Sequence, residues 1–142
     1  VQQCEAGLVP VRPVPDGIAF AAPPLIRSGA LDSDTLARIC DVLGIEPGVI
    51  VDSAWVDNGP GWAAVLLESA DAVLALEPTR NHPGRLEVGI VGPHRAGGHA
   101  DFEVRALFSG QNGALIEDPV TGSLNASIAQ WLLATRRAEP PY

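Results

Sequence analysis

The residues best suited to chemistry lie between positions 117 and 123, where the chain reads EDPVTGS. We expect Thr121 to be the N-cap of a helix over residues 123–134. The backbone N–H groups of Gly122, Ser123 and Leu124 then lack intrahelical acceptors, and such a helix end attracts anions. Asp118 adds a carboxylate that can move or hold a proton. The segment therefore predicts a site that binds a small carboxylate substrate.

A structural alternative stays open for the same residues. Asp118 and Thr121 could simply cap the helix while Ser123 packs against its neighbours, and short motifs of this kind often occur by chance. Capping uses only one side chain, however, whereas this segment places three polar side chains and a glycine at one helix end. That excess favours a functional site.

Helices and strands must position this segment. The helix over 123–134 has apolar or small residues on every side, so we expect it to be buried all round. The expected strands and helices do not alternate regularly along the chain, which predicts an α+β fold. In this fold we expect a mixed curved sheet or barrel to surround the central helix. We expect one domain over residues 1–142. The other expected helices are 31–44 and 70–76, the expected strands are 8–12, 18–21, 49–56, 62–67, 86–91 and 101–108, and residues 109–122 are expected to form a turn-rich connection.

Local signals place the ends of several elements. Asp32 or Ser33 is suited to cap the helix over 31–44, and Gly44 to end it in the left-handed conformation. Ser69 is suited to cap the helix over 70–76. In the strand over 101–108 the apolar residues alternate with charged ones, which predicts a half-exposed strand.

Composition narrows the function classes. The net charge of −8 disfavours nucleic-acid partners, because like charge repels the phosphate backbone. All nine basic residues are arginine, so lysine-based cofactor chemistry is excluded on this chain. No apolar run reaches the length of a membrane span. Two cysteines and no signal-peptide pattern favour a cytoplasmic protein.

Other candidate residues carry weaker signals. His94, His99 and Asp101 match no strong metal-ligand spacing, so we expect a surface loop there and no metal site. Cys40 lies on the apolar side of its helix and is expected in the core. Arg105 is expected to be solvated, with the alternative that it orients Glu117 or Asp118.

The EDPVTGS string followed by an apolar helix resembles the signature of the PhzF-like phenazine biosynthesis family, within the diaminopimelate epimerase-like superfamily. The resemblance covers nearly the whole chain but only the second half of the family's length. Weaker supporting patterns are Cys4-x-Ala6-Gly7-x-Val9, Phe20-x-x-Pro23 and Val104-Arg105-x-x-Phe108.

The resemblance implies two pseudo-symmetric domains with the substrate between them, and a proton shift that needs neither metal nor organic cofactor. Asp118 and Ser123 are the expected catalytic residues, and Glu117, Thr121 and Gly122 the expected substrate-binding residues. The family's general acid/base Glu belongs to the first domain, so we expect this chain alone to be inactive.

The expected function is therefore an isomerase- or epimerase-type reaction on a small carboxylate. A non-catalytic carboxylate-binding domain on the same scaffold is the alternative, and a purely structural or dimerising barrel is a third. The chain contains no Met, which together with the resemblance suggests a domain before Val1 and further strands after Tyr142. The expected partners are that other domain and, as a further candidate, a second copy in a homodimer.

Overall fold

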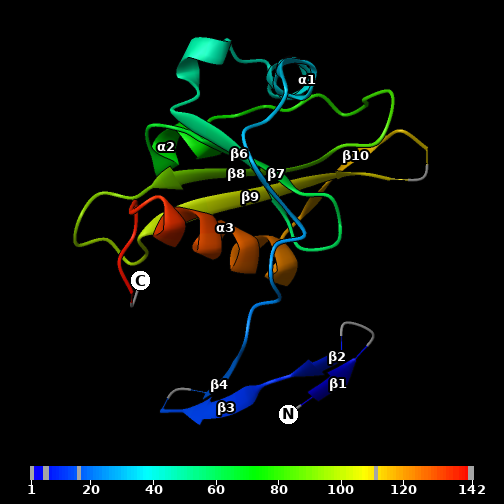
Figure 1. Ribbon diagram of the computed structural model, residues 1–142. Helices are drawn as coiled ribbons and strands as arrows, with labels where there is room; N and C mark the ends of the chain where they lie inside the picture. Colours follow the sequence, from blue (N-terminus) through cyan, green and yellow to red (C-terminus); the bar gives the residue numbers. More distant parts are fainter. Residues whose placement is uncertain (1, 5–6, 16, 111, 141–142) are drawn as a thin grey trace.

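A mixed six-stranded sheet forms the centre of the protein (Figure 1). The computed structural model describes residues 2–4, 7–15, 17–110 and 112–140. The strands of the sheet are β5 (Arg27–Gly29), β6 (Asp52–Asp57), β7 (Ala63–Leu66), β8 (Glu87–Pro93), β9 (Phe102–Ser109) and β10 (Leu115–Asp118). Their order is β10-β9-β8-β7-β6-β5, and only the β7–β8 pair is parallel. The expected α+β class is confirmed, but the sheet of the described residues is open and forms no closed barrel.

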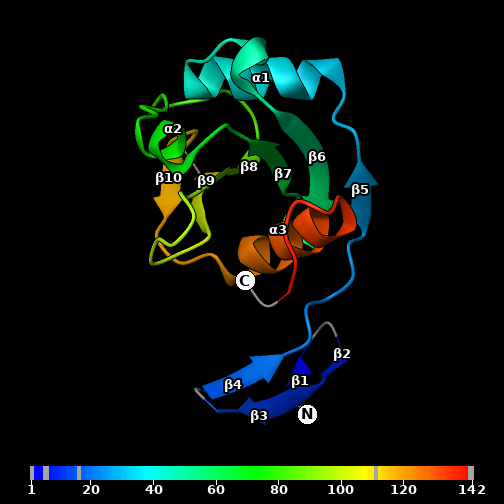
Figure 2. The same ribbon diagram turned by 90° about the vertical axis from the view of Figure 1, so that its left-hand side faces the viewer.

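Helices cover both faces of the sheet (Figure 2). The helices α1 (Ser33–Leu43) and α2 (Ala70–Leu74) lie on one face, and α3 (Gly122–Ala134) lies on the other. A 3-10 turn, η1 (Pro47–Val49), follows α1. Strand β7 is buried on both faces: Ala63 and Val65 pack toward α1, whereas Ala64 and Leu66 pack toward α3. Two apolar layers therefore meet at this central strand.

The expected caps of α1 and α2 are confirmed. The carboxylate of Asp32 accepts a hydrogen bond from Thr35 N at 2.8 Å, and Gly44 ends α1 with a φ of 67°. The hydroxyl of Ser69 accepts from Ala72 N at 3.1 Å, although α2 ends at Leu74, earlier than expected. These interactions span only a few residues, which explains why they can be read from the sequence. Cys40 is buried in α1, as expected.

The expectation that α3 is buried all round is wrong. Its buried residues lie on the side that faces the sheet, namely Leu124, Ser127, Ile128, Trp131 and Leu132. Asn125 and Leu133 are exposed on its outer side. The physical reason is that an open sheet covers only one side of a helix. Within the described residues, no helix is long and apolar enough to cross a membrane.

Residues 109–122, expected as a turn-rich connection, contain the edge strand β10. It pairs antiparallel with β9, and the register places Glu117 opposite Leu107 and Asp118 opposite Ala106. A strand of four residues is too short for its hydrophobic periodicity to be recognised in the sequence. The strand expected over 49–56 is shorter at its start: Val49 belongs to η1, and β6 begins at Asp52.

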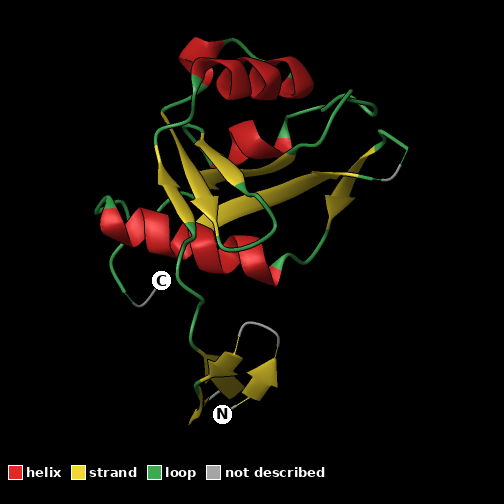
Figure 3. Cartoon of the chain, turned by 45° about the vertical axis from the view of Figure 1, so that its right-hand side comes forward, coloured by secondary structure: helices red, strands yellow, loops and turns green. Residues whose placement is uncertain are grey.

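An N-terminal ribbon extends away from the body of the protein (Figures 1 and 3). It consists of the antiparallel pairs β1 (Gln2–Cys4) with β2 (Gly7–Val9) and β3 (Val11–Val14) with β4 (Gly17–Phe20). Strand β4 confirms the expected strand over 18–21, whereas the expected strand over 8–12 is divided between β2 and β3. Ala6, Asp16 and the side chain of Cys4 lie outside the described residues. Leu8, Ile18 and Phe20 are largely exposed.

The close approach of β8 to α2 gives a first prediction. A Cβ built on Gly92 lies 2.4 Å from Ser69 O, whereas a Cβ on Gly48 meets nothing within 4 Å. We expect Gly92→Ala to lower the free energy of unfolding by about 1–3 kcal/mol, because the backbone of the helix cap cannot move away cheaply. Gly48→Ala should change it by less than about 0.5 kcal/mol. Urea unfolding of both variants measures the difference, and equal values would contradict the packing described.

Candidate functional site

Asp118 ends β10 on the face of the sheet that carries α3. Directly opposite residues of an antiparallel pair point to the same face. Asp118 is opposite Ala106, which belongs to the apolar layer beneath α3. The Oδ1 atom of Asp118 accepts a hydrogen bond from Val120 N at 3.1 Å, so the carboxylate also shapes the turn into the helix. A short connection therefore places Asp118 at the N-terminal end of α3.

Glu117 points to the opposite face, where Arg105 binds both of its carboxylate oxygens. Arg105 Nε donates to Oε1 at 2.7 Å and Nη2 donates to Oε2 at 2.8 Å. Arg105 Nη1 also donates to the carbonyls of Val73 and Leu76, at 3.1 and 2.9 Å, at the end of α2. The guanidinium holds the pKa of Glu117 below its ordinary value, and the pair raises the pKa of Arg105.

This geometry settles the two alternatives for Arg105. Its side chain is only 16% exposed and orients Glu117, so it is not a solvated arginine. The structure brings Asp118 and Ser123 to one end of α3, but it turns Glu117 toward α2. The expected role of Glu117 in substrate binding stays a prediction.

Thr121 occupies the N-cap position of α3 without capping the helix through its side chain. The first bond of the helix runs from Asn125 N to Thr121 O at 3.0 Å. Thr121 is only 8% exposed, and its Oγ1 atom has no hydrogen-bond partner among the described residues. A buried hydroxyl without a partner is costly, so a ligand that reached it would gain a hydrogen bond.

Gly122 leaves the first turn of α3 open. A Cβ built on this residue meets nothing within 4 Å, and its φ lies outside the left-handed region. Within the described residues, neither packing nor backbone conformation therefore requires a glycine here. What the missing side chain does provide is free approach to the N–H groups of the first turn.

Ser123 is held by two residues from the loop between β6 and β7. Trp62 Nε1 donates to Ser123 Oγ at 3.0 Å, and Asn58 Nδ2 donates to Ser123 O at 2.8 Å. Sequence reasoning missed both residues as parts of the site. Asn58 lies between the expected strands over 49–56 and 62–67, Trp62 begins the second of them, and no local pattern connects either residue to α3.

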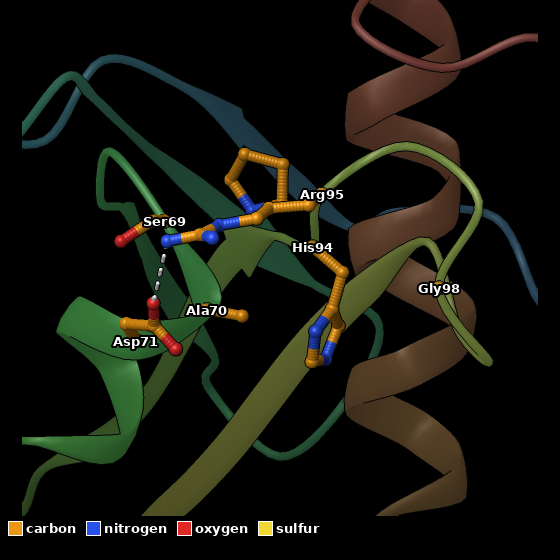
Figure 4. Close-up of a pocket in the computed structure, with 7 residues that line it drawn as sticks. Ser69, Ala70, Asp71, His94, Arg95 and Gly98 are labelled. Carbon is orange, nitrogen blue, oxygen red and sulfur yellow. Dashed lines mark ion pairs between the residues drawn. The ribbon is translucent and has the colours of Figure 1, made fainter.

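A surface pocket of about 450 Å³ lies elsewhere, at the beginning of α2 (Figure 4). Its charged residues Arg95 and Asp71 approach each other at 3.8 Å, but both are more than four-fifths exposed, so their pairing is weak. His94 Nε2 lies 3.1 Å from Glu103 Oε2. No group of residues that could hold a metal ion occurs in the described part of the chain. The pocket is therefore large, but its charged residues Arg95 and Asp71 are exposed and do not form a buried polar site.

Comparison with known proteins identifies the family. Residues 1–141 match the family model described as phenazine biosynthesis-like protein (PhzC-PhzF), and the chain belongs to this family. It is 30% identical over 135 residues to a Pasteurella multocida (strain Pm70) protein named "Uncharacterized isomerase PM1503". The match covers 89% of this chain and 43% of that protein, so the chain spans less than half of that relative's length.

The ion pair between Arg105 and Glu117 gives a second prediction. Because the folded-state pKa of Glu117 is lowered, the pair stabilises the fold at neutral pH. This stabilisation is lost as the pH falls through that lowered pKa. Glu117→Gln should lower the free energy of unfolding by about 1 kcal/mol at pH 7, a small value because the carboxylate is partly exposed.

The measurement is urea unfolding of wild type and Glu117→Gln between pH 7 and strong acid. The difference between them should shrink as the pH falls, because protonated Glu117 no longer attracts Arg105. Glu68→Gln changes an exposed carboxylate and serves as the control. A difference that stays constant with pH would show that the charge of Glu117 contributes nothing.

Proposed function

We propose that this chain supplies the carboxylate-binding part of an isomerase site at the N-terminus of α3. The observation that carries the proposal is the open first turn at Gly122, where packing among the described residues does not require a glycine. Membership of the phenazine biosynthesis-like family and a relative named as an isomerase support the reaction class.

In this proposal the backbone and the side chains at the helix end have different roles. The N–H groups of Gly122, Ser123 and Leu124 bind the substrate carboxylate, because they precede the first bond of the helix and carry its positive dipole end. The hydroxyl of Thr121 gains a partner from the ligand. Asp118 lies on the same face as α3 and orients the reacting group or transfers a proton. The reaction is a proton shift that uses neither a metal nor an organic cofactor.

We further propose that the rest of the site comes from another domain of the same polypeptide, which also supplies the general base. The match covers less than half of the isomerase-named relative, which leaves room for such a domain in proteins of this family. The ribbon of residues 2–20 exposes Leu8, Ile18 and Phe20, a surface suited to packing against another domain or a second copy.

A second candidate function is carboxylate binding without catalysis. The open helix end supports binding by itself, because amide donors and a hydroxyl need no general base to hold a carboxylate. The two functions differ in whether bound substrate exchanges a proton with solvent.

Gly122→Ala gives a third prediction, which separates function from folding. The added methyl group should leave the fold unchanged or stabilise it by about 0.4–1 kcal/mol, because the backbone there is unstrained. It should also block the approach to the first-turn amides and raise the dissociation constant of anthranilate, a small aminocarboxylate probe, about tenfold.

The affinity is measured by NMR titration of the amide signals of α3, with aniline as the probe that lacks a carboxylate. Gly48→Ala is the matched control, because it is equally unstrained and lies outside the site. An unchanged affinity in Gly122→Ala would remove the helix end as the carboxylate site.

Asp118→Asn gives a fourth prediction, which tests catalysis. The variant is made in the full-length polypeptide. The rate at which deuterium from the solvent enters a dihydro-hydroxyanthranilate should fall about a hundredfold or more, because the amide cannot transfer the proton. Proton NMR in D₂O measures the exchange. If the wild-type protein binds anthranilate but shows no deuterium exchange into the substrate, the non-catalytic function is favoured.

A further inference from the structure

We infer that Trp62 is a positioning residue that makes the Ser123 hydroxyl a hydrogen-bond donor toward the substrate carboxylate. The inference rests on the proposed function, because it assumes that the carboxylate binds at the first turn of α3. It adds a residue outside the EDPVTGS segment, contributed by the loop that leads into β7.

The direction of the hydrogen bond follows from the chemistry of the two groups. The indole N–H of Trp62 can only donate, and it lies 3.0 Å from Ser123 Oγ. Ser123 therefore accepts this bond with one of its lone pairs. Its own proton has no acceptor among the side chains and carbonyls of the described residues. That proton is left for a ligand.

Burial makes this arrangement persistent. Trp62 is only 4% exposed and packs in the same apolar layer beneath α3 as Leu124. An indole N–H that loses its acceptor in such a place would be buried without a partner, which is costly. The serine side chain is therefore held in the rotamer that receives the indole, both with and without ligand.

The loop before Trp62 is fixed by its own hydrogen bonds. Asp57 Oδ1 accepts from Gly59 N and from Gly61 N, both at 2.7 Å. Arg85 Nη2 donates to Pro60 O at 2.8 Å. These contacts hold the loop as one unit, so the indole is presented to α3 at a constant position.

Asn58 connects the same loop to the helix by a second contact. Its Nδ2 atom donates to Ser123 O at 2.8 Å and so fixes the backbone of Ser123, whose side chain is bound by Trp62. Main chain and side chain of Ser123 are thus both fixed by one loop. The consequence for specificity is that the ligand group at Ser123 must accept a hydrogen bond. A carboxylate or carbonyl oxygen fits this requirement, whereas an ammonium group does not.

A double-mutant cycle between Trp62→Phe and Ser123→Ala tests the inference, with the dissociation constant of anthranilate as the readout. With Ser123 present, Trp62→Phe should weaken binding about fivefold, the value of one ordinary hydrogen bond. In the Ser123→Ala background, the same change should have less than about a twofold effect. A merely structural loss would weaken binding equally in both backgrounds and would overturn the inference.

Trp131→Phe is the matched control, because Trp131 is a similarly buried indole of the same apolar layer that lies on α3 itself. Its effect should be the same in the wild-type and Ser123→Ala backgrounds. If Trp62→Phe does not fold, benzothienylalanine at position 62 replaces the indole N–H by sulfur at almost unchanged volume and should reproduce the fivefold loss. Binding of wild-type strength with this analogue would also overturn the inference.

The outcomes separate this inference from the proposed function. If Ser123→Ala leaves anthranilate binding unchanged, the hydroxyl does not bind the carboxylate and the inference fails, whereas the proposed binding by the first-turn N–H groups stands. If Ser123→Ala weakens binding while both changes at position 62 do not, the proposed function stands and only the positioning role of Trp62 is wrong.

Discussion

The packing of α3 against the sheet is the contact on which the site depends. Leu124 is fully buried, and it lies where β8 has no side chain: a Cβ on Gly89 would be 2.5 Å from Leu124 Cδ1. This close approach brings the first turn of α3 down toward the beginning of β7. In this packing Trp62 Nε1 lies 3.0 Å from Ser123 Oγ. An apolar contact in the core therefore sets the position of the polar groups at the surface.

The two neighbouring carboxylates of the EDPVTGS segment show how strand geometry divides tasks. Successive side chains of a strand point to opposite faces, so Glu117 and Asp118 meet different environments. Glu117 is bound by Arg105 and ties β10 to the end of α2. Asp118 remains on the face of α3. Adjacent residues of one chemical type thus take part in two unrelated sets of contacts.

Much of the fold could be predicted from local patterns. The caps of α1 and α2 and the existence of α3 all depend on residues within a few positions of one another. The half-exposed strand predicted over 101–108 is wrong, because Leu107 and Arg105 on the second face of β9 are covered. The strand β10 and the exposed side of α3 could not be predicted in the same way. The first is an edge strand of four residues, and the second depends on how far the sheet curves, which no local pattern encodes.

The sequence by itself determined where the candidate site lies and to which family its signature belongs, because Asp118, Thr121, Gly122 and Ser123 are neighbours in one short segment. Only the tertiary structure decided what those residues contact. Trp62 is 61 positions from Ser123, and Arg105 is 12 positions from Glu117. Capping and periodicity act over one or two turns, whereas these partners meet only after the sheet has formed and α3 has packed on it.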